Sequence, residues 1–420
     1  MTALNPKRVI RRASKTGKLA ALGVATASIM LFTQNVSAAP FTAGNLVVER
    51  VGTGVGALPA TATPVFVDEY LRAGGAAVQS IALPAVAAAP SGNPNTVPLA
   101  LTATGTSTSE GYLNLSADGQ YLILTGYNAT TGAAVPGAVG TFQRTIGRID
   151  QAGTINTTTY STAATVGGNA RSATSSNGTS FYGSYSTGGI NYFANLGAIT
   201  STQVSTTITN TRVTEIYNIG SGNNLYFSTG SAPIGIYQLT GLPTTTGNVA
   251  TRIIDTTLSG ALGGGSSPYG FSISPDGLTA YVADDRSIAN GGGLQKYTRP
   301  NTGASFTFAY TLGTGVGSTV GARGLTVDWT TYNSVTMLGA QVFGTTTEAT
   351  ANRIVAVTDA GAGTPAATIA TAAANTVFRG IDFTPTPIPE PSTYLGAGLA
   401  VAALCFSQRW RLAGLLRRNS

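Results

Sequence analysis

The sequence contains no histidine and only one cysteine. Histidine is the commonest general base and a frequent metal ligand, so its absence excludes Ser-His-Asp triads and imidazole metal sites. The single cysteine, Cys405, lies in a C-terminal apolar run, so the folded region can have neither a disulfide nor a thiolate nucleophile. The sequence offers no catalytic motif, and we expect no catalytic residue and no cofactor.

Charged residues are also scarce. They make up 9% of the chain, whereas an average globular protein contains about 25%. Their place is taken by 54 glycines and by abundant threonine and serine. This composition is typical of proteins built from short strands and many turns.

The net charge of +7 comes from the two ends of the chain. Removing the ten basic residues of these ends from the total of 23 leaves 13 against 16 acidic ones, so the middle has a net charge of about −3. A mildly acidic domain has no electrostatic basis for binding nucleic acid, and we expect no such partner. The basic residues of the ends are Lys7, Arg8, Arg11, Arg12, Lys15, Lys18, Arg409, Arg411, Arg417 and Arg418.

The N-terminal segment resembles a secretory signal peptide. Its basic region precedes an apolar stretch from Leu19 to Phe32, which is followed by the small-x-small pattern of Val36-Ser37-Ala38. The apolar stretch is shorter than the roughly 20 residues that span a bilayer, so cleavage after Ala38 or Ala39 is expected. A retained membrane anchor is the alternative interpretation.

The C-terminal segment combines three features in a fixed order. A spacer rich in proline leads to Pro389-Glu390-Pro391, an apolar run follows from Tyr394 to Phe406, and arginines close the chain. This order resembles the PEP-CTERM sorting signal of Gram-negative bacteria that make exopolysaccharide, and the resemblance covers Pro389 to Ser420. The arginines that would stop the segment in the membrane are Arg409, Arg411, Arg417 and Arg418.

The resemblance implies a route for the protein. The terminal arginines would hold an apolar helix with its C-terminus in the cytoplasm, and an exosortase-like protease would then act at Pro389-Glu390-Pro391. We therefore expect the secretion machinery and a signal peptidase as partners, passage through the inner membrane, and a final place at the cell surface or in the extracellular matrix. Leu412 to Leu416 splits the arginines into two clusters, unlike the compact group common in the family, which leaves the membrane register open. A plain C-terminal anchor is the alternative.

Three regions follow from these features. A signal peptide is expected over 1–39, a central domain over 40–384, and a proline spacer with the sorting and transmembrane segment over 385–420.

The central region contains a weak repeat at a spacing of about 50 residues, which suits four-stranded propeller blades. The clearest copies, Glu110 to Thr125 and Tyr269 to Asp284, each place alternating apolar residues before a Ser-x-Asp-Gly turn and a second apolar strand. Asp118-Gly119 and Asp276-Gly277 supply the positive backbone angles that a tight hairpin requires. Degenerate copies are Arg171 to Tyr185, Arg212 to Phe227 and Arg323 to Leu338.

A sixth inner strand, Val377 to Phe383, has no partners after it because the proline spacer begins at once. Three N-terminal segments resemble the missing strands of a blade: Asn45 to Val51, Val65 to Leu71 and Val78 to Leu83. Pairing them would close the ring and remove exposed sheet edges. The sequence therefore predicts an all-β propeller of six blades, with seven blades, a β-helix or a sandwich as alternatives.

Several predicted inner strands carry an arginine near their start: Arg171, Arg212, Arg323 and Arg379. If these side chains converge on the axial opening, they form a candidate site for an anionic group such as a sugar acid. Pairing with nearby acids such as Asp328 and Asp382 is the alternative. Asp284-Asp285 and Asp68-Glu69 are paired acids whose oxygens suit Ca²⁺, but they lack the spacing of a calcium loop, so no metal site is predicted beyond the weak candidates Asp284 and Asp285.

Two function hypotheses remain. The first is a non-catalytic exported surface or matrix protein that binds or scaffolds exopolysaccharide; a purely structural role in a surface layer is close to it. The alternative is a secreted propeller hydrolase or lactonase that acts on extracellular sugars, which rests on fold analogy alone.

Overall fold

The computed structural model describes residues 38–220, 222–259 and 265–387. Residues 1–37 of the proposed signal peptide and residues 388–420 of the proposed sorting segment, which include Pro389-Glu390-Pro391 and the four terminal arginines, lie outside the described residues. Within them, no helix is long and apolar enough to cross a membrane. The helices of this part are the short 3₁₀ turns η1 (Ala164–Val166), η2 (Thr256–Ser259) and η3 (Ile288–Asn290).

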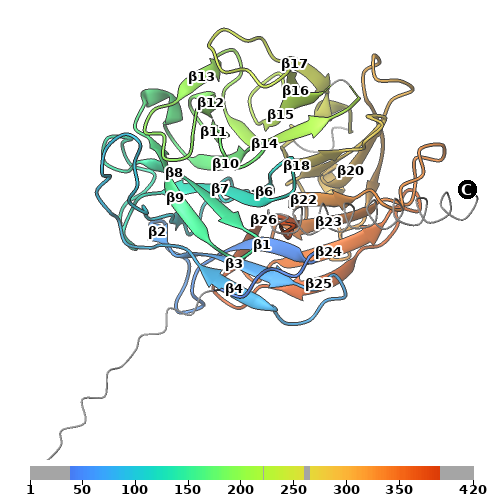
Figure 1. Cartoon of the computed structure of the whole chain (residues 1–420). Coiled ribbons are helices and arrows are strands. Elements are labelled where there is room, and N and C mark those ends of the chain that lie inside the picture. Colours follow the sequence, from blue (N-terminus) through green and yellow to red (C-terminus); the bar gives the residue numbers. More distant parts are fainter. Residues whose placement is uncertain (1–37, 221, 260–264, 388–420) are drawn as a thin grey trace, which may run out of the picture. The chain divides into compact units, whose positions relative to one another are not determined.

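Six four-stranded antiparallel sheets form the blades of a propeller (Figure 1). Blade 1 contains β6 (Asn114–Leu115), β7 (Tyr121–Tyr127), β8 (Arg144–Asp150) and β9 (Ile155–Ser161). Blade 2 contains β10 (Ala170–Thr174), β11 (Phe181–Tyr185), β12 (Gly189–Phe193) and β13 (Thr202–Ser205). Blade 3 contains β14 (Thr211–Asn218), β15 (Asn223–Thr229), β16 (Gly235–Leu239) and β17 (Thr251–Ile254).

The remaining blades follow the same plan. Blade 4 contains β18 (Pro268–Ile273), β19 (Thr279–Asp284), β20 (Gly293–Thr298) and β21 (Thr307–Leu312). Blade 5 contains β22 (Ala322–Asp328), β23 (Gln341–Thr346), β24 (Arg353–Thr358) and β25 (Ala367–Thr371). Blade 6 contains β26 (Val377–Phe383), β1 (Leu46–Val51), β3 (Val65–Tyr70) and β4 (Gln79–Ala82).

Blade 6 closes the ring in the way that the sequence predicts. Its inner strand β26 comes from the C-terminal end of the domain and pairs antiparallel with β1, from Leu46 opposite Phe383 to Val51 opposite Val377. β1 then pairs with β3, and β3 with β4. The prediction of six blades closed by N-terminal strands is therefore confirmed.

Apolar side chains fill the spaces between neighbouring blades. Six hydrophobic clusters are present, and each spans two adjacent blades. In blades 5 and 6, for example, Phe343 and Ile354 pack with Val48 and Ile381. Every blade thus buries both faces, and the pairing of β26 with β1 completes two of the six interfaces.

The predicted hairpin turns form where the sequence places them. Gly119, Gly178 and Gly277 have φ angles of 75°, 72° and 71°, a region in which L side chains are disfavoured. One hairpin differs from the prediction, since β23 begins at Gln341 and not before Leu338. Between the two strands, Asn333 donates a backbone hydrogen bond to Leu338, and Trp329 packs on Tyr332 at 5.1 Å between ring centroids.

A small sheet of β2 (Ala62–Thr63) and β5 (Ala103–Thr104) was also not predicted.

Five of the six inner strands contain a β-bulge near their start. The pairing register with the second strand shifts at Arg171 in β10, and the same irregularity recurs in β14, β18, β22 and β26. A bulge inserts an extra residue and re-aims the side chains around it. The residues at the other four shifts are Arg212-Val213, Tyr269-Gly270, Arg323-Gly324 and Arg379-Gly380.

Glycine within three of these bulges allows adjacent inner strands to approach closely. A Cβ atom on Gly270 would lie 2.7 Å from the backbone nitrogen of Leu325, and one on Gly380 would lie 2.7 Å from the Cα of Tyr112. The backbone of Gly380 also donates a hydrogen bond of 2.7 Å to the carbonyl of Gly111. These contacts tie blade 6 to blade 1 and blade 4 to blade 5 beside the axis.

Replacing Gly380 with alanine is expected to lower the free energy of unfolding by about 1–3 kcal/mol or more, because the methyl group collides with rigid backbone. Gly140→Ala is the matched control, since a Cβ at that position meets nothing within 4 Å. Urea denaturation of both variants measures the difference. Equal midpoints for the two variants would contradict the close packing at Gly380.

Candidate functional site

The propeller has two distinguishable faces. The inner strands begin at one face, which we call the arginine face because Arg171, Arg212, Arg323 and Arg379 lie there, and they end at the other, which we call the turn face. Consecutive inner strands contact each other around the axis in the order β6, β10, β14, β18, β22 and β26, and β26 returns to β6. The four arginines therefore occur at one level of a closed ring.

The structure brings these arginines close to two tyrosines. The charges of Arg212 and Arg323 both act on the buried hydroxyls of Tyr112 and Tyr269, and the charge of Arg171 acts on Tyr269. The tyrosine rings stack at 5.4 Å between centroids. Burial, together with the charge of Arg212, lowers the pKa of Arg171. The arginine face thus has a cationic opening at the axis. We call this opening, formed by the four arginines with Tyr112 and Tyr269, the arginine mouth.

Arg212 and Arg171 are held mainly by backbone carbonyl groups. Arg212 donates to Ser267 Oγ at 2.8 Å and to the carbonyl of Pro268 at 3.0 Å, and its guanidinium lies 3.9 Å from the centroid of Tyr269. Arg171 donates a long bond of 3.4 Å to the carbonyl of Thr211. Among the described residues, neither arginine forms an ion pair.

The other two arginines each have one distant acidic neighbour. Arg323 lies 3.5 Å from Asp285, and Arg379 lies 3.9 Å from Glu110. Arg379 also donates to the carbonyl of Thr104 at 2.5 Å. Both arginines line a cavity of about 210 Å³ together with Tyr112, the segment 105–108 and Glu348.

All four guanidinium groups keep donors without a hydrogen-bond partner in the described structure. The Nε atoms of the four arginines and Nη1 of Arg379 are buried and have no hydrogen-bond partner. Arg323 Nε and Arg379 Nη1 have only the long ion pairs with Asp285 and Glu110. A buried donor without a partner costs roughly 1–3 kcal/mol. The mouth therefore has more N–H donors than acceptors, an arrangement that an anionic ligand would stabilise.

Acidic residues only partly balance this charge. Glu49, on β1 opposite the bulge in β26, is fully buried and has no hydrogen-bond partner on either carboxylate oxygen. Burial raises its pKa to about 8, although the charge of Arg379 acts in the opposite direction. At neutral pH Glu49 is mainly protonated, which leaves Glu110, Asp285 and Glu348 as the carboxylates beside four arginines.

The alternative prediction, that nearby acids pair with the inner arginines, holds for Arg323 and Arg379, but with Asp285 and Glu110 as the partners. The two acids named in it, Asp328 and Asp382, do not take part. Asp328 pairs with Arg72 at 2.5 Å. Asp382 accepts hydrogen bonds from the backbone of Leu115 and from Thr326 Oγ1 at the turn face. The reason is position along the strand, because these acids follow the bulge and lie away from the arginine face.

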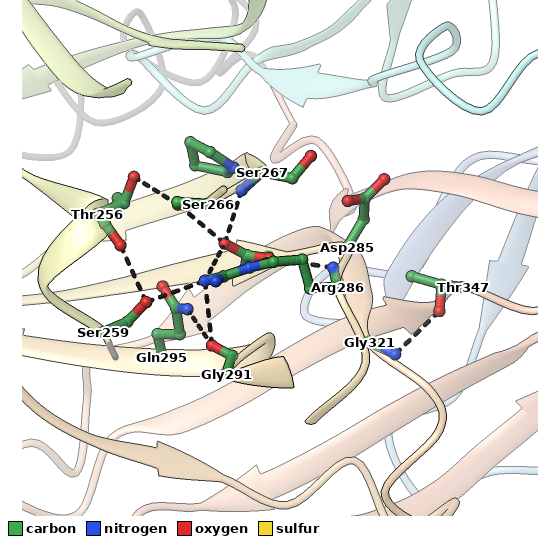
Figure 2. A network of polar contacts seen from close by, with 12 residues as sticks. Thr256, Ser259, Ser266, Ser267, Asp285, Arg286, Gly291, Gln295, Gly321 and Thr347 are labelled. Atoms are coloured by element: carbon green, nitrogen blue, oxygen red, sulfur yellow. Dashed lines mark hydrogen bonds and ion pairs between the residues drawn. The ribbon is translucent and has the colours of Figure 1, made fainter. Parts of the chain in front are cut away.

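The structure separates the weak metal candidates Asp284 and Asp285. Asp284 is fully buried, pairs with Arg286 at 2.9 Å and accepts from Ser266 and Ser267. Figure 2 shows Arg286 at the centre of this network and Asp285 directed away from it. Among the described residues, no group of three or more His, Cys, Asp or Glu side chains could hold a metal ion. Asp68 and Glu69 are likewise separated, since Asp68 pairs with Arg50 whereas Glu69 accepts from Asn45.

Sequence reasoning missed several residues of the mouth. The repeat pattern could have predicted Tyr269, because Tyr269-Gly270 occupies the same position in its inner strand as Arg323-Gly324 and Arg379-Gly380 do in theirs. No sequence pattern could have predicted Glu49 or Glu348. Glu49 reaches the mouth from β1, the second strand of blade 6, and Glu348 from the loop after β23, the second strand of blade 5.

Comparison with known proteins gives structural likeness only. No protein-family model and no curated protein matches the chain. Among solved structures, a candidate 6-phosphogluconolactonase from Bacteroides uniformis is 14% identical, with 82% of this chain and 84% of that chain covered at a TM-score of 0.40. A protein from Lactobacillus plantarum is 13% identical, with 79% and 83% covered at a TM-score of 0.41. The site is therefore interpreted from its own residues.

The pKa of Glu49 predicts a specific pH dependence of stability. Because burial raises its pKa in the folded state to about 8, above the ordinary value of about 4.5 for a glutamate in an unfolded chain, the folded state retains a proton that the unfolded state loses. The resulting stabilisation is complete below about pH 4.5 and is lost as the pH rises through 8.

The Glu49→Gln variant is uncharged at this position at every pH, so it should gain about 4–5 kcal/mol over the wild type at pH 8.5 and less than about 1 kcal/mol at pH 5. Urea denaturation at both pH values measures the gain. Asp255→Asn, on the surface of blade 3, controls for the loss of one negative charge. A gain of equal size at pH 5 and pH 8.5 would rule out titration of Glu49.

Proposed function

We propose that this chain is an exported bacterial surface protein that binds a carboxylated saccharide at the arginine mouth. The observation that carries the proposal is a set of four arginines that share one level of the ring and keep buried guanidinium donors without a hydrogen-bond partner. Arg171 and Arg379 are buried, and Arg212 and Arg323 are partly buried. A planar guanidinium matches a carboxylate with two parallel hydrogen bonds. Uronic acids, which carry one carboxylate per sugar ring, have the matching chemistry.

The position of the chain ends supports a surface role. Phe41 donates a backbone hydrogen bond to Gln151, and Thr386 donates one to Gly119, so both ends of the described chain lie at the turn face. Under the proposed sorting route, an exosortase-like protease acts beyond Pro387, on that same side. Before processing, the arginine mouth would then lie on the face away from the membrane anchor.

A hydrolase or lactonase is the second candidate. The observation that favours it is Glu348, whose carboxylate oxygens are buried without hydrogen-bond partners in the cavity that Arg323 and Arg379 also line. Glu348 has one long ion pair, in which its Oε1 lies 3.7 Å from Arg353 Nε. A carboxyl group beside arginines could transfer a proton while an anionic substrate is held. The cavity contains no second carboxylate among its lining residues, so binding is the stronger proposal.

Binding is tested with oligogalacturonate, and its uncharged methyl ester serves as the matched ligand. Arg323→Gln should weaken oligogalacturonate binding about tenfold or more, because a charge-assisted hydrogen bond contributes roughly 1.5–3 kcal/mol. Isothermal titration calorimetry measures the affinities, and increasing salt should weaken binding.

Arg252→Gln is the control variant, since Arg252 forms a surface pair with Asp255 on the outer strand of blade 3. Equal binding of the ester, or unchanged affinity in Arg323→Gln, would refute the arginine mouth as the site. The same samples are assayed for reducing ends and for lactone opening. Turnover that disappears in Glu348→Gln would replace the binding proposal with the hydrolase.

The sorting route is tested by the mass and location of the mature protein from its native host. We expect the wild type to lose both ends, whereas simultaneous replacement of Pro389, Glu390 and Pro391 with alanine should leave a membrane-bound form that retains the C-terminus. Intact mass spectrometry of the membrane and extracellular fractions distinguishes these forms. A wild-type protein with an uncut C-terminus would exclude the sorting proposal and leave a simple anchor.

A further inference from the structure

The turn face has a second cavity at the opposite end of the axis. It has a volume of about 290 Å³, near the lower end of pockets that hold small organic molecules. Residues of five blades line it, and it reaches solvent beside the exposed residues Ala117, Asn218 and Pro275. This cavity is separate from the arginine mouth, and the inference below does not depend on the function proposed there.

Two carboxyl groups from opposite blades line this cavity. Glu215 lies on β14 and Asp382 on β26, and these strands are three places apart in either direction around the ring of six. Each acid follows an arginine by three residues, in Arg212-Val-Thr-Glu215 and in Arg379-Gly-Ile-Asp382. Because a bulge intervenes in both strands, the arginine and the acid can both face the axis, one at each end.

The two carboxyl groups differ in how they are held. Asp382 accepts hydrogen bonds from Leu115 at 2.6 Å, from Thr326 at 2.9 Å and from its neighbour Phe383. Glu215 is 8% exposed, and no described residue donates a hydrogen bond to its carboxyl group or pairs with it. Apart from Glu49, the other buried acids of the domain are held by a cation, as Asp359 is by Lys296, or by hydrogen-bond donors, as Glu69 is by Asn45.

No cation among the described residues compensates these acids. The residues that line the cavity include neither lysine nor arginine, and its titratable groups are Glu215, Asp382 and Tyr217. Burial raises the pKa of Glu215 and that of Asp382, and the charge of Asp382 raises the pKa of Glu215 further. A cation that enters between the two groups would favour their ionised forms.

Aromatic side chains form part of the same wall. The Tyr217 hydroxyl donates to the carbonyl of Phe271 at 2.8 Å, and Trp329 Nε1 donates to Ser272 Oγ at 3.2 Å. Their polar atoms are thus occupied. The Trp329 ring packs on Tyr281 and Tyr332, and both Tyr217 and Trp329 line the cavity. Aromatic faces attract organic cations, and tryptophan does so most strongly.

We propose that the turn-face cavity binds an organic ammonium group, of the kind that an amino sugar carries, between Glu215 and Asp382 and against Trp329. The aromatic wall and the size of the cavity favour a small organic cation over a metal ion, which would require six or more oxygen ligands in the case of Ca²⁺. The hydroxyls of Ser272 and Thr326 lie in the same wall and suit a polyhydroxylated ligand.

The proposal is tested with glucosamine, and N-acetylglucosamine serves as the matched ligand without a charge. Calorimetry on the full chain should detect glucosamine and give at least tenfold weaker binding of N-acetylglucosamine. Glu215→Gln should weaken glucosamine binding at least tenfold, whereas Asp255→Asn, an acidic surface position on the same blade, should have no effect. Trp329 and Trp410 are the two tryptophans, and a fluorescence change on binding should disappear in Trp329→Phe.

Proton release provides a second measurement on the wild type, which stays informative even if a variant does not fold. Because cation binding ionises the carboxyl groups, glucosamine affinity should rise from pH 5 to pH 7, and buffers of different ionisation enthalpy should reveal released protons. Equal binding of both sugars, or glucosamine binding that is independent of pH and of Glu215, would overturn the proposal. Calcium binding that depends on Glu215 and excludes glucosamine would assign the cavity to a metal instead.

Discussion

The pairing of β26 with β1 is the constraint on which the rest of the structure depends. Each blade buries apolar side chains on both faces, so a blade without a neighbour on one face would expose an apolar surface to water. Without this pairing, Val48 and Ile381 lose their partners and two strand edges are exposed, which favours aggregation. The same pairing joins the two ends of the domain at one face and places Glu49 beside Arg379. The arginine mouth therefore forms only in the closed ring.

The repeated bulge determines which side chains of the inner strands face the axis of the ring. In a regular strand, residues three apart point to opposite faces. The extra residue in β14 and β26 shifts this alternation, which allows Arg212 and Glu215, or Arg379 and Asp382, to approach the same axis at different depths. Glycine after Arg323 and Arg379 provides the space in which the next strand packs.

Much of the fold was predictable because its signals are local. The Ser-x-Asp-Gly turns mark hairpins through the positive φ of residues such as Gly119, and an inner strand left without partners at Val377–Phe383 implies closure by the N-terminus. The arginines were recognised from their position in each repeat. Glu49 and Glu215 were not, because what distinguishes them is burial among residues of other blades. The long turn after Trp329 was missed because its aromatic packing involves the neighbouring blade.

The axis of this propeller is chemically asymmetric. Guanidinium groups with unpaired donors gather where the inner strands begin, and carboxyl groups without a cation gather where they end. These charges belong to the same strands, yet they do not neutralise each other, because β14 and β26 keep their arginine and their acid at opposite mouths. Folding alone would favour pairing them, since a buried charge without a partner is costly. This separation is what the two proposals share, an anionic ligand at the arginine mouth and a cationic one in the turn-face cavity.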